Sequence, residues 1–271
     1  MTSHSVRTPD LHQWVAGLDI GSTTVKAILF NGSGYQARMT PAGWNPKELA
    51  IDLLSSLCDE IGLTTLPLLI ATTGYGRRCL DSAVISPTEI TCHARGAVFL
   101  VPGCRFVIDI GGQDAKGICL SADGFVEDFV MNDKCAAGTG RFLSTVGAAL
   151  DISVDSLAKF AEGAESHRIN SMCTVFAESE VISLINQGIS RNAIIGGLHA
   201  SIARRTASMV SSLHPAPPIV FTGGVSQNGD IVQKLGKELG FPVIVPDDAL
   251  YAGALGAALL AWAHLEENGK K

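Results

Sequence analysis

Two segments of the chain share one pattern of apolar and polar positions. Residues 17–30 read GLDIGSTTVKAILF, and residues 107–120 read VIDIGGQDAKGICL. In each copy an apolar run reaches an aspartate, turns through glycine and returns as a second apolar run, which predicts a strand, a tight turn and a strand. Both copies fit D-I-G-x-x-x-x-K-x-I at an offset of ninety positions. That offset is too long for a solenoid repeat, so we expect two lobes that open with the same hairpin.

The rest of the pattern predicts further helices and strands. Leucines at helical spacing predict a helix over 46–62, and a short apolar run predicts a strand over 67–71. After the second copy we expect helices over 139–150, 174–186, 192–213 and 252–264, with strands over 218–222 and 242–246. No flexible linker or low-complexity segment divides the chain.

Composition narrows the class of protein. The 271 residues are 46% hydrophobic and 17% charged, which fits one large or two modest compact domains and excludes a disordered chain. A net charge of −6 without any basic cluster gives no electrostatic basis for binding nucleic acid or an anionic membrane. The N-terminus lacks an apolar signal segment, and the apolar stretch 253–265 is interrupted by His264 and too short to span a bilayer. Together with seven cysteines that form no disulfide pattern, these features predict a cytoplasmic protein that is not exported.

The turn of the first copy carries groups that suit a phosphate chain. Backbone N–H groups and hydroxyls from Gly21, Ser22, Thr23 and Thr24 are suitable donors, and Asp19 suits a hydrated divalent cation. The turn of the second copy offers the same chemistry from the other lobe, through Asp109, Gly111, Gly112, Gln113 and Asp114. Each turn alone fits an ordinary glycine hairpin equally well, but two that face each other favour phosphate binding. Neither a P-loop nor a G-x-G-x-x-G dinucleotide fingerprint is present.

A third glycine element follows a predicted buried strand. Residues 221–228 read FTGGVSQN, and the paired Gly223 and Gly224 would let a flat ring lie against the backbone. A simple strand-to-helix turn explains the same letters. Downstream of two phosphate hairpins, however, this is the element that an adenosine site needs.

The complete set of motifs resembles a known family. The two phosphate elements and the adenosine element resemble those of the actin, heat-shock-chaperone and sugar-kinase superfamily. More specifically, the chain resembles the ATPase activators (component A) of 2-hydroxyacyl-CoA dehydratases, whose family includes the ATPase subunits of benzoyl-CoA reductases. The resemblance runs from about residue 15 to residue 260 and rests on DIGSTTVK, ATTGYGR, EITCHARGA, DIGGQDAK, MNDKCAAGTGRFL, CTVFAESEVISL, FTGGVSQN and GALGAAL.

The resemblance implies an α/β fold with two ribonuclease-H-like lobes of the actin/sugar-kinase type and a nucleotide cleft between them. We expect a polar extension over 1–13, lobe I over 14–105 and lobe II over 106–251, with the helix over 252–265 crossing back to lobe I.

Two cysteines are candidate ligands of an iron–sulfur cluster. Cys135 and Cys173 each stand just before a predicted helix, and helix N-termini favour thiolates and anionic clusters. Two ligands per chain are too few for a 4Fe–4S cluster, which is usually held by four cysteines. The resemblance implies one cluster shared across a homodimer. The remaining cysteines are expected to be small buried apolar residues, and these are Cys58, Cys79, Cys92, Cys104 and Cys119.

The resemblance also implies roles for the turn residues. Asp19 and Asp109 would hold Mg²⁺ through waters, the small residues would contact the phosphates of ATP or ADP, and Gly223 and Gly224 would flank adenine. Gln113 is the candidate for orienting the attacking water, by analogy with other nucleotide hydrolases. The strand pattern leaves open which way Lys26 and Lys116 point. No firm role is assigned to His93, Arg141, Glu178 or Glu180.

The resemblance implies an anaerobic activity in which ATP hydrolysis drives one electron from ferredoxin or flavodoxin to a separate dehydratase. There the electron reduces a 2-hydroxyacyl-CoA to a ketyl radical, so that water can be eliminated. Closure of a lobe around ATP would tilt the helices that follow the cysteines and alter the exposure of the cluster. The alternatives are an ATPase subunit of a benzoyl-CoA-type reductase, a kinase of a sugar or acetate, and a chaperone-like ATPase with structural thiols. The kinase predicts substrate-dependent ADP release and no iron, and the chaperone-like ATPase predicts ATP turnover that is insensitive to oxygen.

Overall fold

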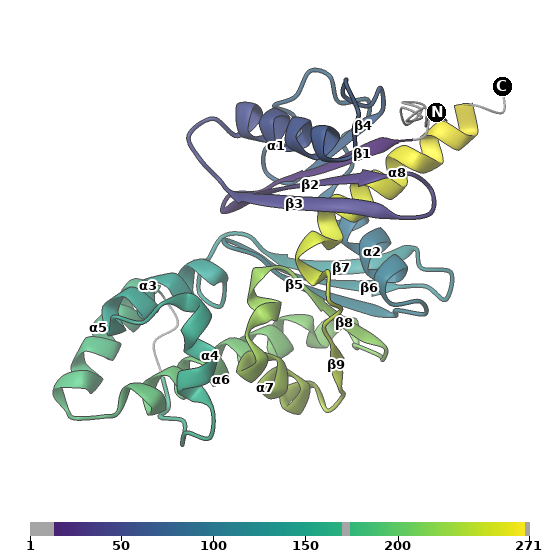
Figure 1. Cartoon of the computed structure of the whole chain (residues 1–271). Coiled ribbons are helices and arrows are strands. Elements are labelled where there is room, and N and C mark those ends of the chain that lie inside the picture. Colours follow the sequence, from purple (N-terminus) through teal and green to yellow (C-terminus); the bar gives the residue numbers. More distant parts are fainter. Residues whose placement is uncertain (1–13, 170–173, 269–271) are drawn as a thin grey trace, which may run out of the picture. The chain divides into compact units, whose positions relative to one another are not determined.

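The computed structural model describes residues 14–169 and 174–268, and these divide into two compact units (Figure 1). The first unit contains the described residues up to Gly96 together with those from Tyr251 onward. The second unit is Ala97–Leu250. The extension expected over 1–13 lies outside the described residues.

A mixed sheet forms the centre of the first unit. Its strands are β1 (Val15–Ile20), β2 (Thr24–Phe30), β3 (Tyr35–Pro41) and β4 (Ile70–Thr73). Their order is β3-β2-β1-β4, with β1 antiparallel to β2 and parallel to β4. Beyond β4, Ala71 and Ile85 form a single parallel bridge, which adds the start of another strand at that edge.

Helices cover both faces of this sheet. They are α1 (Pro46–Glu60) and α8 (Ala252–Asn268), and α2 (Glu89–Leu100) extends from this unit across its boundary. Alternate β1 residues, including Leu18, form a core with Leu54 and other residues of α1. The intervening Gly17 faces α8, whose Ala254 carbonyl oxygen lies only 2.1 Å from the position of a Cβ on that glycine. The small side chain therefore lets α8 pack directly on β1.

α8 belongs to a segment that is long and apolar enough to cross a membrane. This segment, Ala249–Asn268, exceeds the stretch expected from the sequence, and half of its most apolar window is buried inside the protein. Since α8 packs on β1, β2 and β4, its apolar composition is explained by its place in the core of the first unit.

The second unit repeats the strand arrangement of the first. Its strands are β5 (Phe106–Ile110), β6 (Ala115–Leu120), β7 (Val126–Asn132), β8 (Ile219–Thr222) and β9 (Val243–Ile244). Their order is β7-β6-β5-β8-β9, with β5 antiparallel to β6 and parallel to β8. The first four strands thus have the order and directions of β3-β2-β1-β4. The duplicated hairpin expected from the sequence is confirmed, and the duplication extends to a third and a fourth strand.

The helices of the second unit are α3 (Gly140–Leu150), α4 (Leu157–Ala161), α5 (Thr174–Asn186), α6 (Arg191–Val210) and α7 (Gly229–Leu239). Ser190 and Asn228 cap the N-termini of α6 and α7 by accepting hydrogen bonds from backbone N–H groups. The core of the unit joins Phe106 and Ile108 of β5 to apolar residues of these helices. A continuous apolar core therefore places the β5–β6 turn beside the start of α3.

The sequence pattern missed two strands and two long helices. β3 and β7 lie next to β2 and β6 at the outer edges of the sheets, and most of their side chains are partly or fully exposed, so they lack a clean alternation. The predicted strand over 67–71 starts later, at Ile70. α2 was not expected, and α7 was expected only as a helix start after FTGG.

Candidate functional site

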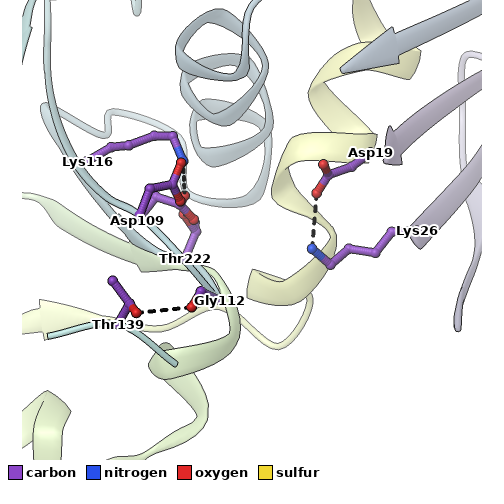
Figure 2. Close-up of polar contacts among 8 residues, drawn as sticks. Asp19, Lys26, Asp109, Gly112, Lys116, Thr139 and Thr222 are labelled. Carbon is purple, nitrogen blue, oxygen red and sulfur yellow. Dashed lines mark hydrogen bonds and ion pairs between the residues drawn. The ribbon is translucent and has the colours of Figure 1, made fainter. Parts of the chain in front are cut away.

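The first hairpin, β1–β2, presents small polar groups at its tip. The N–H of Gly21 donates to the carbonyl oxygen of Thr24 at 3.0 Å, and Ser22 and Thr23 are exposed between them. Asp19 stands directly opposite Lys26 in the β1–β2 register, and Lys26 Nζ lies 3.0 Å from Asp19 Oδ2 (Figure 2). The tip is therefore free to bind anions, while the aspartate is held by its neighbouring strand.

The second hairpin, β5–β6, has the same turn. The N–H of Gly111 donates to the carbonyl oxygen of Asp114 at 3.0 Å. Lys116 is opposite Asp109, as Lys26 is opposite Asp19. Its Nζ lies 3.3 Å from Asp109 Oδ2 (Figure 2). The same atom lies 2.7 Å from Asp114 Oδ2. The question left open by the sequence is answered, since both lysines point to the aspartate of their own hairpin.

A threonine lies beside each aspartate, on the neighbouring parallel strand. Thr222 of β8 pairs with Asp109 in register, and its Oγ1 donates to Asp109 Oδ1 at 2.9 Å (Figure 2). Thr73 of β4 holds the equivalent position beside Asp19, but its hydroxyl donates to the carbonyl oxygen of Pro87 at 3.2 Å. The two units thus differ in how the aspartate is oriented. Sequence reasoning missed this pair, although Thr-Gly follows a buried apolar run in both places.

Gly223 and Gly224 have different environments. Gly223 has φ +83°, and a Cβ there would lie 2.4 Å from the carbonyl oxygen of Ile110 and 2.7 Å from Asp109 Oδ1. The equivalent Gly74 has φ +88° and the same close approach to β1. Gly223 is thus explained by packing against β5, whereas Gly224 is exposed with open space at its Cβ position. Of the two, Gly224 is the glycine with room for a ligand beside it.

Gln113 lies at the tip of the second hairpin. It is half-buried, and its side chain makes no hydrogen bond to another described residue. Asp109, in contrast, is buried and bonded to both Lys116 and Thr222. The geometry leaves the Gln113 amide available for a ligand and fixes the direction of the Asp109 carboxylate.

The donor set suits Mg²⁺ bound together with a nucleotide. Across the described ranges, 14–169 and 174–268, no cluster of three or more His, Cys, Asp or Glu side chains forms a ready-made metal centre. Mg²⁺ commonly needs only one or two carboxylates, with waters and substrate phosphates completing its shell. Asp19 in the first unit and Asp109 in the second unit each offer one carboxylate beside a hairpin turn, which fits that requirement.

Cys135 lies in a loop, residues 133–139, that joins β7 to α3 and is called the cysteine loop below. It is a partly buried free thiol, and its carbonyl oxygen accepts a hydrogen bond from Asn132 Nδ2 at 3.0 Å. α3 begins at Gly140, one residue after the expected start, so Cys135 precedes the helix by five positions and is not at the helix start itself. The intervening residues form a turn containing Gly138 at φ +90°. Cys173, the second candidate ligand, lies outside the described residues.

The other cysteines divide into two groups. Burial raises the pKa of Cys58 and Cys104 to about 11 and that of Cys92 to about 12, as expected for thiols in a core. Cys79 and Cys119 are only partly buried, so the expectation of full burial is wrong for these two. Their pKa values are also raised, chiefly by partial burial.

The N-terminus of α3 is bonded to the second hairpin. The N–H groups of Gly140 and Arg141 each donate at 2.9 Å, to the carbonyl oxygens of Gly111 and Gly112 respectively. These are helix N–H groups that have no partner within the helix itself. This contact between the second hairpin and the start of α3 was not predicted, because it joins segments that are far apart in the sequence.

A buried polar network anchors the segment after FTGG. His199 Nδ1 lies 2.7 Å from Asp230 Oδ2, and Asn228 Nδ2 lies 3.2 Å from His199 Nε2. Burial acts to raise the pKa of the Asp230 carboxyl, but hydrogen bonds from His199 and Lys234 outweigh it and hold that pKa below its usual value. The network ties α7 to α6 and so fixes the position of the FTGG segment.

The residues to which the sequence assigns no firm role lie in different parts of the structure. His93 is buried in the first unit, beside Gly253 of α8, and Glu178 and Glu180 are half-buried on α5. Arg141 is exposed at the start of α3, where its N–H contacts the second hairpin.

Comparison with known proteins gives consistent results. The sequence model of the BadF/BadG/BcrA/BcrD ATPase family matches residues 16–261. The uncharacterized protein YjiL of Escherichia coli (strain K12) is 46% identical over 90% of this chain and 95% of its own length. The 2-hydroxyisocaproyl-CoA dehydratase activator of Clostridioides difficile is 39% identical over 95% of this chain and 98% of its own length.

A solved structure agrees with these relatives. The activator of the 2-hydroxyisocaproyl-CoA dehydratase from Clostridium difficile, with bound ADPNP, superposes with a TM-score of 0.89. It is 38% identical, and the match covers 95% of this chain and 97% of that chain.

Proposed function

This chain belongs to the BadF/BadG/BcrA/BcrD ATPase family, and we propose that it is the ATP-dependent activator of a 2-hydroxyacyl-CoA dehydratase. In this proposal it transfers one low-potential electron from a ferredoxin or flavodoxin to the dehydratase, in the cytoplasm of an anaerobically growing cell. The observation that carries the proposal is that the second hairpin, a candidate phosphate-binding turn, is hydrogen-bonded directly to the start of the helix that follows Cys135. This arrangement provides a physical route from bound nucleotide to the cysteine loop. The full-length likeness to a dehydratase activator supports the choice of partner.

The two hairpin tips bind the phosphates of ATP. Ser22, Thr23 and Thr24 offer N–H groups and hydroxyls, and the exposure of Ser22 and Thr23 supports that role. Gly21, whose own N–H donates to Thr24, shapes the turn that presents them. Gly111 and Gly112 act in the second hairpin, where α3 occupies both of their carbonyl oxygens. The Gly111 N–H closes the turn onto Asp114, so the Gly112 N–H is the one left for a phosphate oxygen. Asp19 and Asp109 hold Mg²⁺ through waters.

Hydrolysis needs an oriented water and a fixed carboxylate. Gln113 orients the attacking water, since its amide has no other described partner. Asp109 is the second catalytic residue, and Lys116 and Thr222 hold it in position. The adenine lies beside Gly224, where a Cβ position meets open space, and Gly223 shapes the turn.

The thiols of this chain suit a 4Fe–4S cluster only as part of a shared site. Cys135 provides a thiol that is not fully buried, on a loop rather than inside the core. With Cys173 it makes two ligands per chain, so a homodimer supplies the four that such a cluster needs. When bound, the cluster supplies the one-electron carrier. Asn132 orients the backbone that carries Cys135.

Iron analysis after anaerobic purification tests the proposal. About four iron atoms per dimer are expected, and Cys135→Ala should lose them. Cys104→Ala is the matched control, because that buried thiol should leave the iron content unchanged. Native protein that contains no iron, even after reconstitution, would exclude electron transfer and favour the kinase alternative.

ATP turnover provides a separate test. Gln113→Ala should lower kcat for ATP hydrolysis about 10²-fold with little change in nucleotide affinity, as for other groups that act only in the transition state. Unchanged turnover in this variant would remove Gln113 from the mechanism.

A further inference from the structure

Thr139 is the last residue of the cysteine loop, and its side chain contacts both the second hairpin and Ala136 within the loop. Its side chain is buried, and its Oγ1 lies 3.0 Å from the carbonyl oxygen of Gly112, as Figure 2 shows. The same Oγ1 lies 2.7 Å from the carbonyl oxygen of Ala136, the residue after Cys135. Although Thr139 is the N-cap residue of α3, its side chain does not cap that helix. The hydroxyl is directed to the hairpin and the loop.

The hydroxyl has one proton for these two acceptors. Each acceptor also has a second donor, since the N–H of Arg141 reaches Gly112 at 2.9 Å and the N–H of Thr139 reaches Ala136 at 3.0 Å. Neither carbonyl is left unpaired when the proton is directed to the other one. Two hydrogen-bond arrangements are therefore available without the cost of a buried unsatisfied group.

We propose that Thr139 is a positioning residue that transmits nucleotide occupancy of the second hairpin to Cys135; this inference rests on the function proposed above. Phosphate bound at the hairpin pulls on the N–H groups of its tip and moves the Gly112 peptide. The Thr139 hydroxyl then directs its proton to Ala136. Cys135 is bonded to Ala136, and the peptide between them is held by Asn132 through the Cys135 carbonyl oxygen, so a change at Ala136 changes the position of the cysteine loop.

The test measures the thiol itself, in the full chain freed of iron and kept anaerobic. The rate at which N-ethylmaleimide alkylates Cys135 is followed by peptide mass spectrometry, with and without Mg-ADPNP. Nucleotide affinity is measured on the same samples. The variants are Thr139→Val, which keeps the shape and removes the hydroxyl, and Thr139→Ser, which keeps the hydroxyl. Thr145→Val is the matched control, because the Thr145 hydroxyl donates within α3, to the carbonyl oxygen of Arg141.

In the native protein, Mg-ADPNP is expected to change the alkylation rate at least 3-fold. Thr139→Val should abolish that change while its nucleotide affinity stays within 3-fold of native. Thr139→Ser and Thr145→Val should both keep the change. If Thr139→Val proves unfolded by circular dichroism, Thr139→Ala, which removes the hydroxyl without adding bulk, gives the same comparison.

A native-like nucleotide response in folded Thr139→Val or Thr139→Ala would overturn the inference. A native protein that binds Mg-ADPNP without any change at Cys135 would also overturn it and would leave the ATPase proposal standing. Failure of the native protein to bind nucleotide would overturn the proposed function itself.

Discussion

Substitution of Lys116 by methionine should destabilise the second hairpin far more than the equivalent change destabilises the first. The Lys116 side chain is 2% exposed and contacts two carboxylates whose side chains are 3% and 12% exposed. Methionine fills most of the space but leaves both carboxylates buried without this cation. Removal of one partner from a buried ion pair typically costs about 3–5 kcal/mol. We expect that range for Lys116→Met.

Lys26 provides the matched comparison. It holds the same register position in the first hairpin and forms an ion pair with Asp19, with side chains 12% and 8% exposed. One buried acceptor that loses its partner costs about 1–3 kcal/mol. Lys26→Met should therefore cost less, and its effect should fall on the other unit.

Native-state hydrogen exchange separates the two effects, because each hairpin reports on its own lysine. A loss of about 3 kcal/mol corresponds to about 150-fold faster exchange. Lys116→Met should accelerate exchange in peptides over 106–120 at least about 100-fold and leave those over 15–30 unchanged. Lys26→Met should show the reverse pattern with a smaller factor.

A second substitution checks the cause. Asp114→Asn added to Lys116→Met removes one of the two carboxylate charges, so the double variant should regain at least about 1 kcal/mol over the single one. The reasoning is refuted if Lys116→Met exchanges within 3-fold of native over 106–120. It is also refuted if Asp114→Asn brings no recovery.

Three further predictions follow from contacts described above. Thr222→Val should lower kcat for ATP hydrolysis about 10-fold in a steady-state assay, because it removes one hydrogen bond to the catalytic aspartate. Thr73→Val, at the equivalent position, should not lower kcat, and equal effects of the two variants would contradict this role. Gly223→Ala should lower Tm by several degrees, because Gly223 has a positive φ and lies close to the β5 backbone. Gly224→Ala should keep Tm and weaken ADP binding, and an unchanged Tm for Gly223→Ala would be inconsistent with the packing described above. Burial raises the pKa of Cys92 to about 12, so this thiol should resist iodoacetamide at pH 8. The contribution of Cys92 to stability should be lost as pH rises from 9 toward 12. Rapid labelling of Cys92 in folded protein would argue against this raised pKa.

The hairpins could be predicted because their information is local. An apolar run, an aspartate, a glycine turn and a second run lie within fourteen consecutive residues in each copy. The lysine orientation was also within reach, since the Gly21-to-Thr24 turn determines that Asp19 faces Lys26. The pairing of residues between the two strands follows from counting outward from that turn, and the alternation of apolar and polar residues does not give it.

The remaining site features depend on contacts between distant segments. Thr222 reaches Asp109 across 113 positions, and Thr139 reaches Gly112 across 27. Neither contact leaves a periodic signal in the sequence. The start of α3 was predicted to within one residue, but the Gly138 turn that separates Cys135 from this helix was not, because it leaves no periodic signal either.

The position of α8 has a consequence for how the protein is made. The first unit needs this C-terminal helix to cover β1, but the ribosome must first synthesise the second unit, about 150 residues. At typical elongation rates this takes roughly 8 to 30 s. During that interval the Gly17 face of β1 has no helix against it, while the second unit, which is continuous in sequence, can already fold. A chaperone that binds nascent chains would find its target on β1, and a circular permutant that begins with α8 should depend on it less.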